Sequence, residues 1–140
     1  MSPMPRWDDL AVGRELPSYT APPLTRADFV RYQGASGDVN PAHHDDGFAR
    51  AAGFPSVFAP GMYGAGVLGT YLTDLLGAQN LRHLAVRFCD QAWPGDRLTF
   101  TACVTARGER GGERLVELDA RCTRQTGSVH VSARATFVVP

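Results

Sequence analysis

The longest apolar stripe in the chain has the period of an α-helix and lies near the middle of the sequence. Between residues 61 and 78, apolar side chains recur mostly every three or four positions, at Met62, Ala65, Leu68, Leu72, Leu75 and Leu76. This spacing predicts a helix of about four turns with one buried face. The same stretch holds Gly64, Gly66 and Gly69. Each glycine disfavours a helix by about 1 kcal/mol relative to alanine, so we expect close packing against a sheet to compensate.

After residue 81 the hydrophobic pattern changes from the period of a helix to the period of a strand. Alternating apolar and polar positions predict strands over residues 84–88, 98–104, 115–122 and 129–139. Turns are expected at Pro94 with Gly95 and at Gly111 with Gly112. The second half of the chain is therefore predicted to form an antiparallel meander. A weaker strand is expected earlier, near residues 15–19.

Cap and turn signals organise the region before the central helix. Thr25 followed by Asp28 resembles a helix N-cap with an acidic first turn, and the helical spacing then continues to about Ser36. The run GDVNPAHHD at residues 37–45 is dense in turn formers, and Asn40 is kept out of the helical region by Pro41. We predict a polar loop there, followed by a brief helical turn over residues 45–52.

The order of these elements indicates an α+β fold. A weak strand, short helices, a long glycine-rich helix and then several strands resemble the hot-dog fold, in which an antiparallel sheet wraps around a long central helix. The sequence contains no repeat or long linker, so residues 1–140 are predicted to form a single domain. The sheet would leave an exposed edge, which favours a dimer or higher oligomer.

Composition narrows the classes of partner. The chain is 44% hydrophobic and 20% charged with a formal net charge of zero, which is typical of a globular protein and unlike a nucleic-acid-binding domain. All fourteen cationic residues are arginine, which excludes lysine Schiff-base chemistry. The uncharged run over residues 61–73 is too short to span a membrane. The N-terminus does not resemble a signal peptide, and three widely spaced cysteines indicate no disulfide framework. We expect a cytoplasmic protein without nucleic-acid or membrane partners.

The loop at residues 37–45 carries the candidate chemistry. Asp38 and His43 stand five positions apart, between turn formers that can direct both side chains to one point. A carboxylate and an imidazole in that arrangement can hold one water and exchange protons with it. The alternative is purely structural, because such residues often make local turn and cap hydrogen bonds. A metal site at residues 43–46 is disfavoured, because consecutive side chains diverge and no second ligand cluster follows.

Around this loop the sequence resembles the MaoC-like dehydratases, which are the (R)-specific enoyl-CoA hydratases. The resemblance rests on SGDVNPAHHDDGFARAAGFPSVFAPGM at residues 36–62 and on VRFCDQAWPGDRL at residues 86–98. It implies that Asp38 and His43 are catalytic and that Gly61 and Met62, at the start of the central helix, form the oxyanion and substrate-binding position. It also implies supporting roles for three residues of the loop motif, Gly37, Asn40 and Pro41.

The resemblance implies a hydro-lyase that adds water reversibly across the double bond of a trans-2-enoyl thioester. Asp38 and His43 would hold the water, with one group taking its proton and the other protonating the α-carbon. The Gly61 amide would steady the enolate oxygen. No metal or redox cofactor is required, since CoA or a carrier-protein pantetheine belongs to the acyl substrate. A homodimer or a hetero-oligomer with a related subunit is implied.

Two positions depart from the family pattern. Pro60 stands where many members carry a histidine, and Gly69 stands where some carry a serine that supports the aspartate. We interpret these changes as affecting the acyl-chain environment or the residues that support the catalytic pair, without loss of the chemistry. They leave the acyl group unassigned among fatty, polyketide and steroid side chains. Two other functions stay open: a non-catalytic acyl-thioester-binding subunit of a heteromeric hydratase, and a thioesterase on the same fold.

Overall fold

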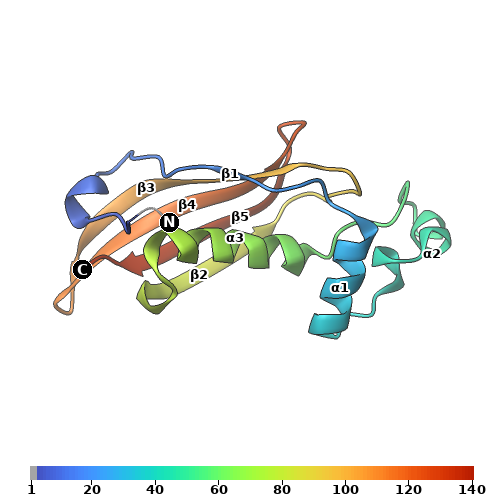
Figure 1. Ribbon diagram of the computed structural model, residues 1–140, viewed down its shortest axis with the longest axis horizontal. Helices are drawn as coiled ribbons and strands as arrows, with labels where there is room; N and C mark the ends of the chain where they lie inside the picture. Colours follow the sequence, from blue (N-terminus) through green and yellow to red (C-terminus); the bar gives the residue numbers. More distant parts are fainter. Residues whose placement is uncertain (1–2) are drawn as a thin grey trace.

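The computed structural model describes residues 3–140, and it consists of one antiparallel sheet with a long helix lying along one face (Figure 1). The helices are α1 (Arg26–Ser36), α2 (Asp46–Ala51) and α3 (Gly61–Leu76), with short 3-10 turns at Trp7–Asp9, Pro41–His43 and Ala78–Asn80. The strands are β1 (Tyr19–Thr20), β2 (Leu81–Phe88), β3 (Leu98–Arg110), β4 (Glu113–Arg124) and β5 (Val129–Val138). The predicted α+β class, with an antiparallel sheet around a central helix, is confirmed.

The sheet has the strand order β1-β3-β4-β5-β2. The predicted meander is therefore correct for β3, β4 and β5 but wrong for β2, which pairs with β5 at the far edge. Only Leu81 and Leu84 of β2 are even partly buried, whereas β3, β4 and β5 bury every second residue along much of their length. A strand with so little buried surface suits the edge of a sheet, but its periodicity alone does not identify its neighbour.

α3 packs on the sheet through small and aliphatic side chains. Its buried residues are Gly64, Ala65, Leu68, Tyr71, Leu72 and Leu76. Met62 was predicted on this buried stripe, but the residue is 54% exposed, although Gly64 in the same turn is buried. The helix ends two residues before the predicted limit, where Gly77 adopts a φ of +85° and its amide bonds to the Thr73 carbonyl at 2.8 Å.

Close packing explains some of the helix glycines. A Cβ on Gly64 would lie 2.6 Å from Nε2 of His130 in β5, and a Cβ on Gly61 would lie 2.9 Å from the ring of Phe88 in β2. At these two positions the expected close approach to the sheet is present. At Gly66 the expectation is wrong, because among residues 3–140 no heavy atom lies within 4 Å of its Cβ position apart from its chain neighbours and the backbone of its own helix.

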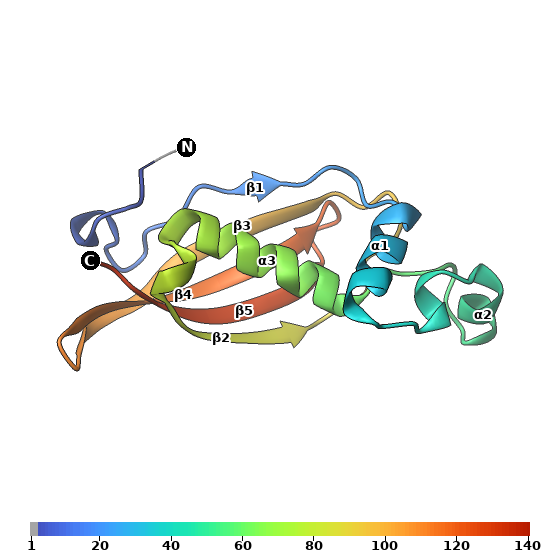
Figure 2. The same cartoon turned by 60° about the horizontal axis from the view of Figure 1, so that its bottom comes forward.

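The first helix begins and ends where its sequence signals predict. Thr25 Oγ1 accepts from the Asp28 amide at 3.1 Å, and Asp28 Oδ2 accepts from the Thr25 amide at 2.9 Å. Gly37 then terminates α1 with a φ of +78°, a left-handed conformation that favours glycine. Figure 2 shows α1 and α2 beyond one end of the sheet, with α1 beside the N-terminal end of α3.

The predicted strand limits differ most from those of the structure where both faces of the sheet are exposed to solvent. β3 and β4 continue as a paired hairpin up to the turn at Gly111. The predicted strands stop earlier because the outer ends of this hairpin are exposed and lack the alternating apolar residues on which the prediction depends. The early strand is shorter than predicted, with a bridge from Glu15 to Cys103 and a two-residue β1. Pro17 between them lacks an amide hydrogen for the ladder. Among the described residues, no helix has the length and apolar character needed to cross a membrane.

Candidate functional site

The loop after α1 is built from turns that its own side chains stabilise. Asp38 Oδ1 accepts from the Asn40 amide at 3.1 Å, and Asn40 Oδ1 accepts from the Ala42 amide at 3.0 Å. Pro41 opens the 3-10 turn that carries His43, where its missing amide hydrogen is not needed. Gly37, Asn40 and Pro41 therefore shape the backbone that presents Asp38 and His43.

The structure brings Asp38 and His43 together. His43 Nε2 lies 3.6 Å from Asp38 Oδ2, with the His43 side chain only 8% exposed and that of Asp38 43% exposed. His43 Nδ1 donates to the Phe58 carbonyl at 2.7 Å, so in the neutral ring Nε2 is an acceptor. Two acceptors that face each other at 3.6 Å cannot bond directly, but a water can donate one hydrogen to each.

The preceding helix contributes a buried polar residue that sequence reasoning did not identify. Gln33 is 6% exposed; its Nε2 donates to the Asn40 carbonyl at 2.9 Å and its Oε1 accepts from His44 Nδ1 at 3.0 Å. It therefore fixes the loop on both sides of His43. A signal was available, since Gln33 lies one helical turn after buried Phe29 and so faces the interior.

The other polar side chains of this segment point away from the pair. Asp45 Oδ1 caps α2 by accepting from the Phe48 amide at 3.1 Å, and Asp46 Oδ1 accepts from the Val57 amide at 3.0 Å. This Val57 hydrogen bond and the Arg26 guanidinium lower the pKa of Asp46 from its ordinary value. Residues 43–46 thus do not converge. Within residues 3–140, no group of three or more His, Cys, Asp or Glu side chains is placed to hold a metal ion.

The beginning of α3 adjoins this loop. His43 bonds to the carbonyl of Phe58, three residues before Gly61, and the ring of Tyr32 on α1 meets that of Tyr63 edge-on at 5.7 Å. The N-cap residue, Pro60, provides no side-chain hydrogen bond to the first turn, and its carbonyl accepts from the Tyr63 amide at 3.0 Å. The amides of Gly61 and Met62 are the ones in that turn that can receive an anion.

The side of Gly61 where a Cβ would point is filled by the Phe88 ring. The glycine is therefore explained first by this packing. Met62 turns its side chain outward, so only its backbone lies at the beginning of α3. Gly69, further along α3, has Leu84 3.7 Å from its Cβ position, an ordinary packing distance.

The chain is similar in sequence to known proteins along most of its length. The family model described as MaoC like domain matches residues 10–126. An (R)-specific enoyl-CoA hydratase from Rhodospirillum rubrum is 30% identical over 119 residues, covering 84% of this chain and 81% of the relative. A UPF0336 protein from Clavibacter michiganensis is 32% identical over 137 residues, covering 91% of each chain.

Solved structures show the same fold. The (R)-hydratase from A. caviae has a TM-score of 0.80 and 25% identity, covering 94% of this chain and 98% of that one. The ChsH1-ChsH2 complex from Mycobacterium tuberculosis also has a TM-score of 0.80, at 24% identity, covering 93% of this chain and 98% of that one. By the match of its sequence along most of its length, the chain belongs to the MaoC-like domain family, the hydratases and dehydratases of the hot-dog fold.

Proposed function

We propose that this protein catalyses the reversible hydration of a trans-2-enoyl thioester to a 3-hydroxyacyl thioester. The observation that carries the proposal is the pair of acceptors, Asp38 Oδ2 and His43 Nε2, which face each other at 3.6 Å. The named activity of the Rhodospirillum rubrum relative supports this substrate class and the (R) product. CoA or pantetheine is then part of the substrate, and residues 1–140 act as one domain.

The pair performs general acid–base chemistry on a single water. As the water oxygen bonds to the β-carbon, one of its hydrogens passes to the pair, and the electrons of the double bond move onto the thioester as an enolate. A proton from the pair then reaches the α-carbon. The hydroxyl group of the water is then on the β-carbon and a hydrogen is on the α-carbon, and the enzyme has returned to its starting protonation state. Because His43 Nδ1 is held by the Phe58 carbonyl, only Nε2 of the ring takes part.

The first turn of α3 stabilises the enolate. The free amides of Gly61 and Met62 point out of the helix end, where the dipole favours negative charge. Since Phe88 fills the side of Gly61, the thioester oxygen approaches along the helix axis, from beyond Pro60. This direction also faces the loop that carries Asp38 and His43, because Phe58 links the two segments.

We further propose that the working form is a dimer joined along β2, and that it acts in the cytoplasm. β2 is the sheet's longer edge strand, and it exposes 36% of Val86 and 53% of Phe88. The ChsH1-ChsH2 structure is a complex of two chains, so the second chain here is either identical or related. Light scattering of the purified chain tests this, and an active monomer would contradict it.

Loss of the enoyl thioester's absorbance, measured with enoyl-CoAs of different chain length, tests the reaction. We expect Asp38→Asn and His43→Ala each to lower kcat by about 100-fold or more, because general acid–base steps contribute on that scale. The matched variant is His44→Ala, which removes the neighbouring ring and should do much less. If His44→Ala were the damaging change and His43→Ala harmless, the assignment would be wrong.

A thiol reagent in the same assay separates the other candidate functions. Release of free thiol without loss of the conjugated double bond would indicate a thioesterase. Binding of the enoyl thioester by a folded chain that shows neither reaction would indicate a subunit that depends on a partner for catalysis.

A further inference from the structure

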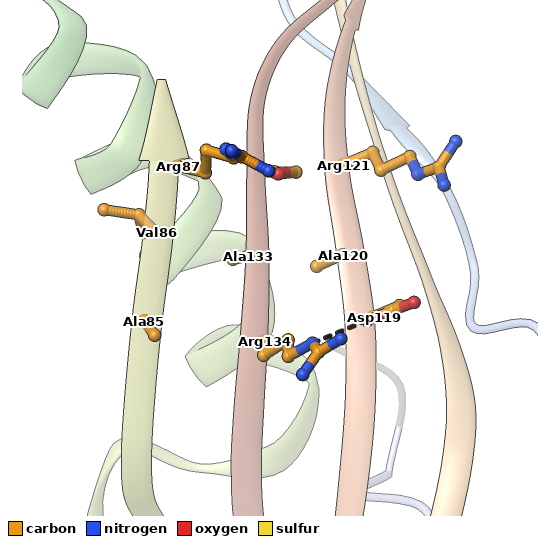
Figure 3. Close-up of a pocket in the computed structure, with 9 residues that line it drawn as sticks. Ala85, Val86, Arg87, Asp119, Ala120, Arg121, Ala133 and Arg134 are labelled. Atoms are coloured by element: carbon orange, nitrogen blue, oxygen red, sulfur yellow. Dashed lines mark ion pairs between the residues drawn. The ribbon is translucent and has the colours of Figure 1, made fainter. Parts of the chain in front are cut away.

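The face of the sheet opposite α3 carries two arginines that form no ion pair with any of residues 3–140. Arg87 of β2 and Arg121 of β4 both stand directly opposite Ser132 of β5, so the three residues form one line across neighbouring strands. Figure 3 shows this face, with the Arg87 side chain lying across β5 and that of Arg121 directed toward β3. Residues of all three strands line a hollow of about 360 Å³.

The charges on this face are unevenly distributed. Two residues along β5 from Ser132, Arg134 Nε lies 4.0 Å from Asp119 Oδ1, so the charge of this arginine has a carboxylate partner. Within the described part of the chain, neither Arg87 nor Arg121 has a carboxylate within 4.0 Å. Glu117 lies a further row away, opposite Thr136. The row of Arg87, Ser132 and Arg121 therefore holds two uncompensated positive charges, and neither guanidinium contributes an ion pair to the fold.

We propose that Arg87, Arg121 and Ser132 form a binding site for a phosphate group on this outer face. Neighbouring strands lie about 4.8 Å apart, so the two arginine backbones are about 10 Å from each other with the serine hydroxyl midway. The Arg87 side chain already lies across β5, and the exposed Arg121 side chain, now directed toward β3, would have to turn back toward β5 to bind the same phosphate above Ser132. The Ser132 hydroxyl can donate to that phosphate as well. The oxygens of a tetrahedral phosphate can accept paired hydrogen bonds from two planar guanidinium groups, whereas the two oxygens of a carboxylate pair with one.

The position of the row indicates where such a phosphate can come from. Arg87 precedes Phe88, whose ring contacts Gly61 at the beginning of α3. Successive strand residues face opposite sides of a sheet, so the phosphate row and the proposed thioester position share one end of β2 on opposite faces. The phosphate belongs either to the CoA of the substrate, a case that rests on the proposed function, or to a separate phosphate-bearing ligand.

Calorimetric titration of the full chain with inorganic pyrophosphate tests the site directly. We expect Arg87→Gln and Arg121→Gln each to weaken binding about tenfold, as expected for losing one charge-assisted contact. The control is Arg110→Gln, which removes the same charge from the exposed end of β3 and should change affinity less than about twofold. Equal losses in all three variants, or no binding by the unaltered chain, would overturn the proposal.

Kinetics then identify the source of the phosphate. If the site holds CoA, Arg87→Gln raises KM for but-2-enoyl-CoA and leaves KM for but-2-enoyl-pantetheine unchanged. If KM is unchanged for both thioesters while pyrophosphate binding is lost, the site serves a separate ligand. A chain that hydrates no enoyl-CoA of any chain length tested contradicts the proposed function, but the pyrophosphate titration still decides the phosphate site.

Discussion

The contact between Gly61 and Phe88 gives a double-mutant test of why glycine opens α3. A Cβ at position 61 would lie 2.9 Å and 3.0 Å from two ring carbons of Phe88, whereas carbon atoms normally approach to about 3.5–4.0 Å. The ring must therefore move by about 0.5–1 Å to admit a methyl group. Overpacking of this kind costs about 1–3 kcal/mol. Because Phe88 is 53% exposed and can turn outward, we expect Gly61→Ala to cost about 1 kcal/mol, near the lower limit.

Removing the ring should remove this cost. In a Phe88→Ala background, Gly61→Ala is expected to leave the free energy of unfolding unchanged or slightly higher, because alanine favours the helix. Urea unfolding gives the stability, and kcat/KM for enoyl-CoA hydration, compared within each background, gives the coupling. Any loss of activity that Gly61→Ala causes should also be relieved in the Phe88→Ala background. If stability recovered and activity did not, the methyl group would be obstructing the thioester oxygen itself, and the approach along the helix axis would be wrong.

Four further substitutions have expected outcomes. Gly64→Ala should destabilise the protein by about 2 kcal/mol through its contact with the His130 ring, whereas Gly66→Ala, on the open side of the same helix, should stabilise it by up to about 1 kcal/mol in urea unfolding. Gln33→Leu should lower kcat more than it raises KM while circular dichroism shows a folded chain; equal kcat would refute its role in fixing the loop. Burial opposes ionisation of Asp96, but hydrogen bonds, chiefly from Arg124, leave its pKa below the ordinary value. Its contribution to stability is therefore present above the ordinary pKa and is lost as pH falls through the lowered one, and Asp96→Asn should be less stable at pH 7 and flatten this acid dependence.

Local signals in the sequence predicted the elements that depend on near neighbours. The first helix was predictable because Thr25, Asp28 and Gly37 satisfy the backbone at its two ends. The proximity of Asp38 and His43 was predictable for the same reason, since the turns between them are closed by the loop's own side chains. Long apolar periodicity gave α3, with an error of two residues at its end.

Features that depend on distant segments were not accessible in this way. The placement of β2 beside β5 is set by a long-range pairing that leaves no periodic trace. The contact of Phe88 with Gly61, the hydrogen bond that Gln33 donates to Asn40 and the one that it accepts from His44 join separate elements. Helical spacing places Gln33 on the buried side of α1, but it does not show which loop groups its amide binds. Phe88 has the local pattern of an ordinary strand residue, and only the tertiary structure distinguishes it.

β2 connects the three proposals physically. Its free edge is the proposed dimer contact, its Phe88 ring forms a wall at the beginning of α3, and its Arg87 belongs to the outer phosphate row. A second copy paired antiparallel along this edge would place the first residues of its own β2 beside the Phe88 end of the first copy. The site of each copy would then be bordered by the other. Activity should therefore depend on association of the two copies. A Phe88 variant with lower activity must be examined by light scattering, because the loss can be assigned to catalysis only if the oligomer is unchanged.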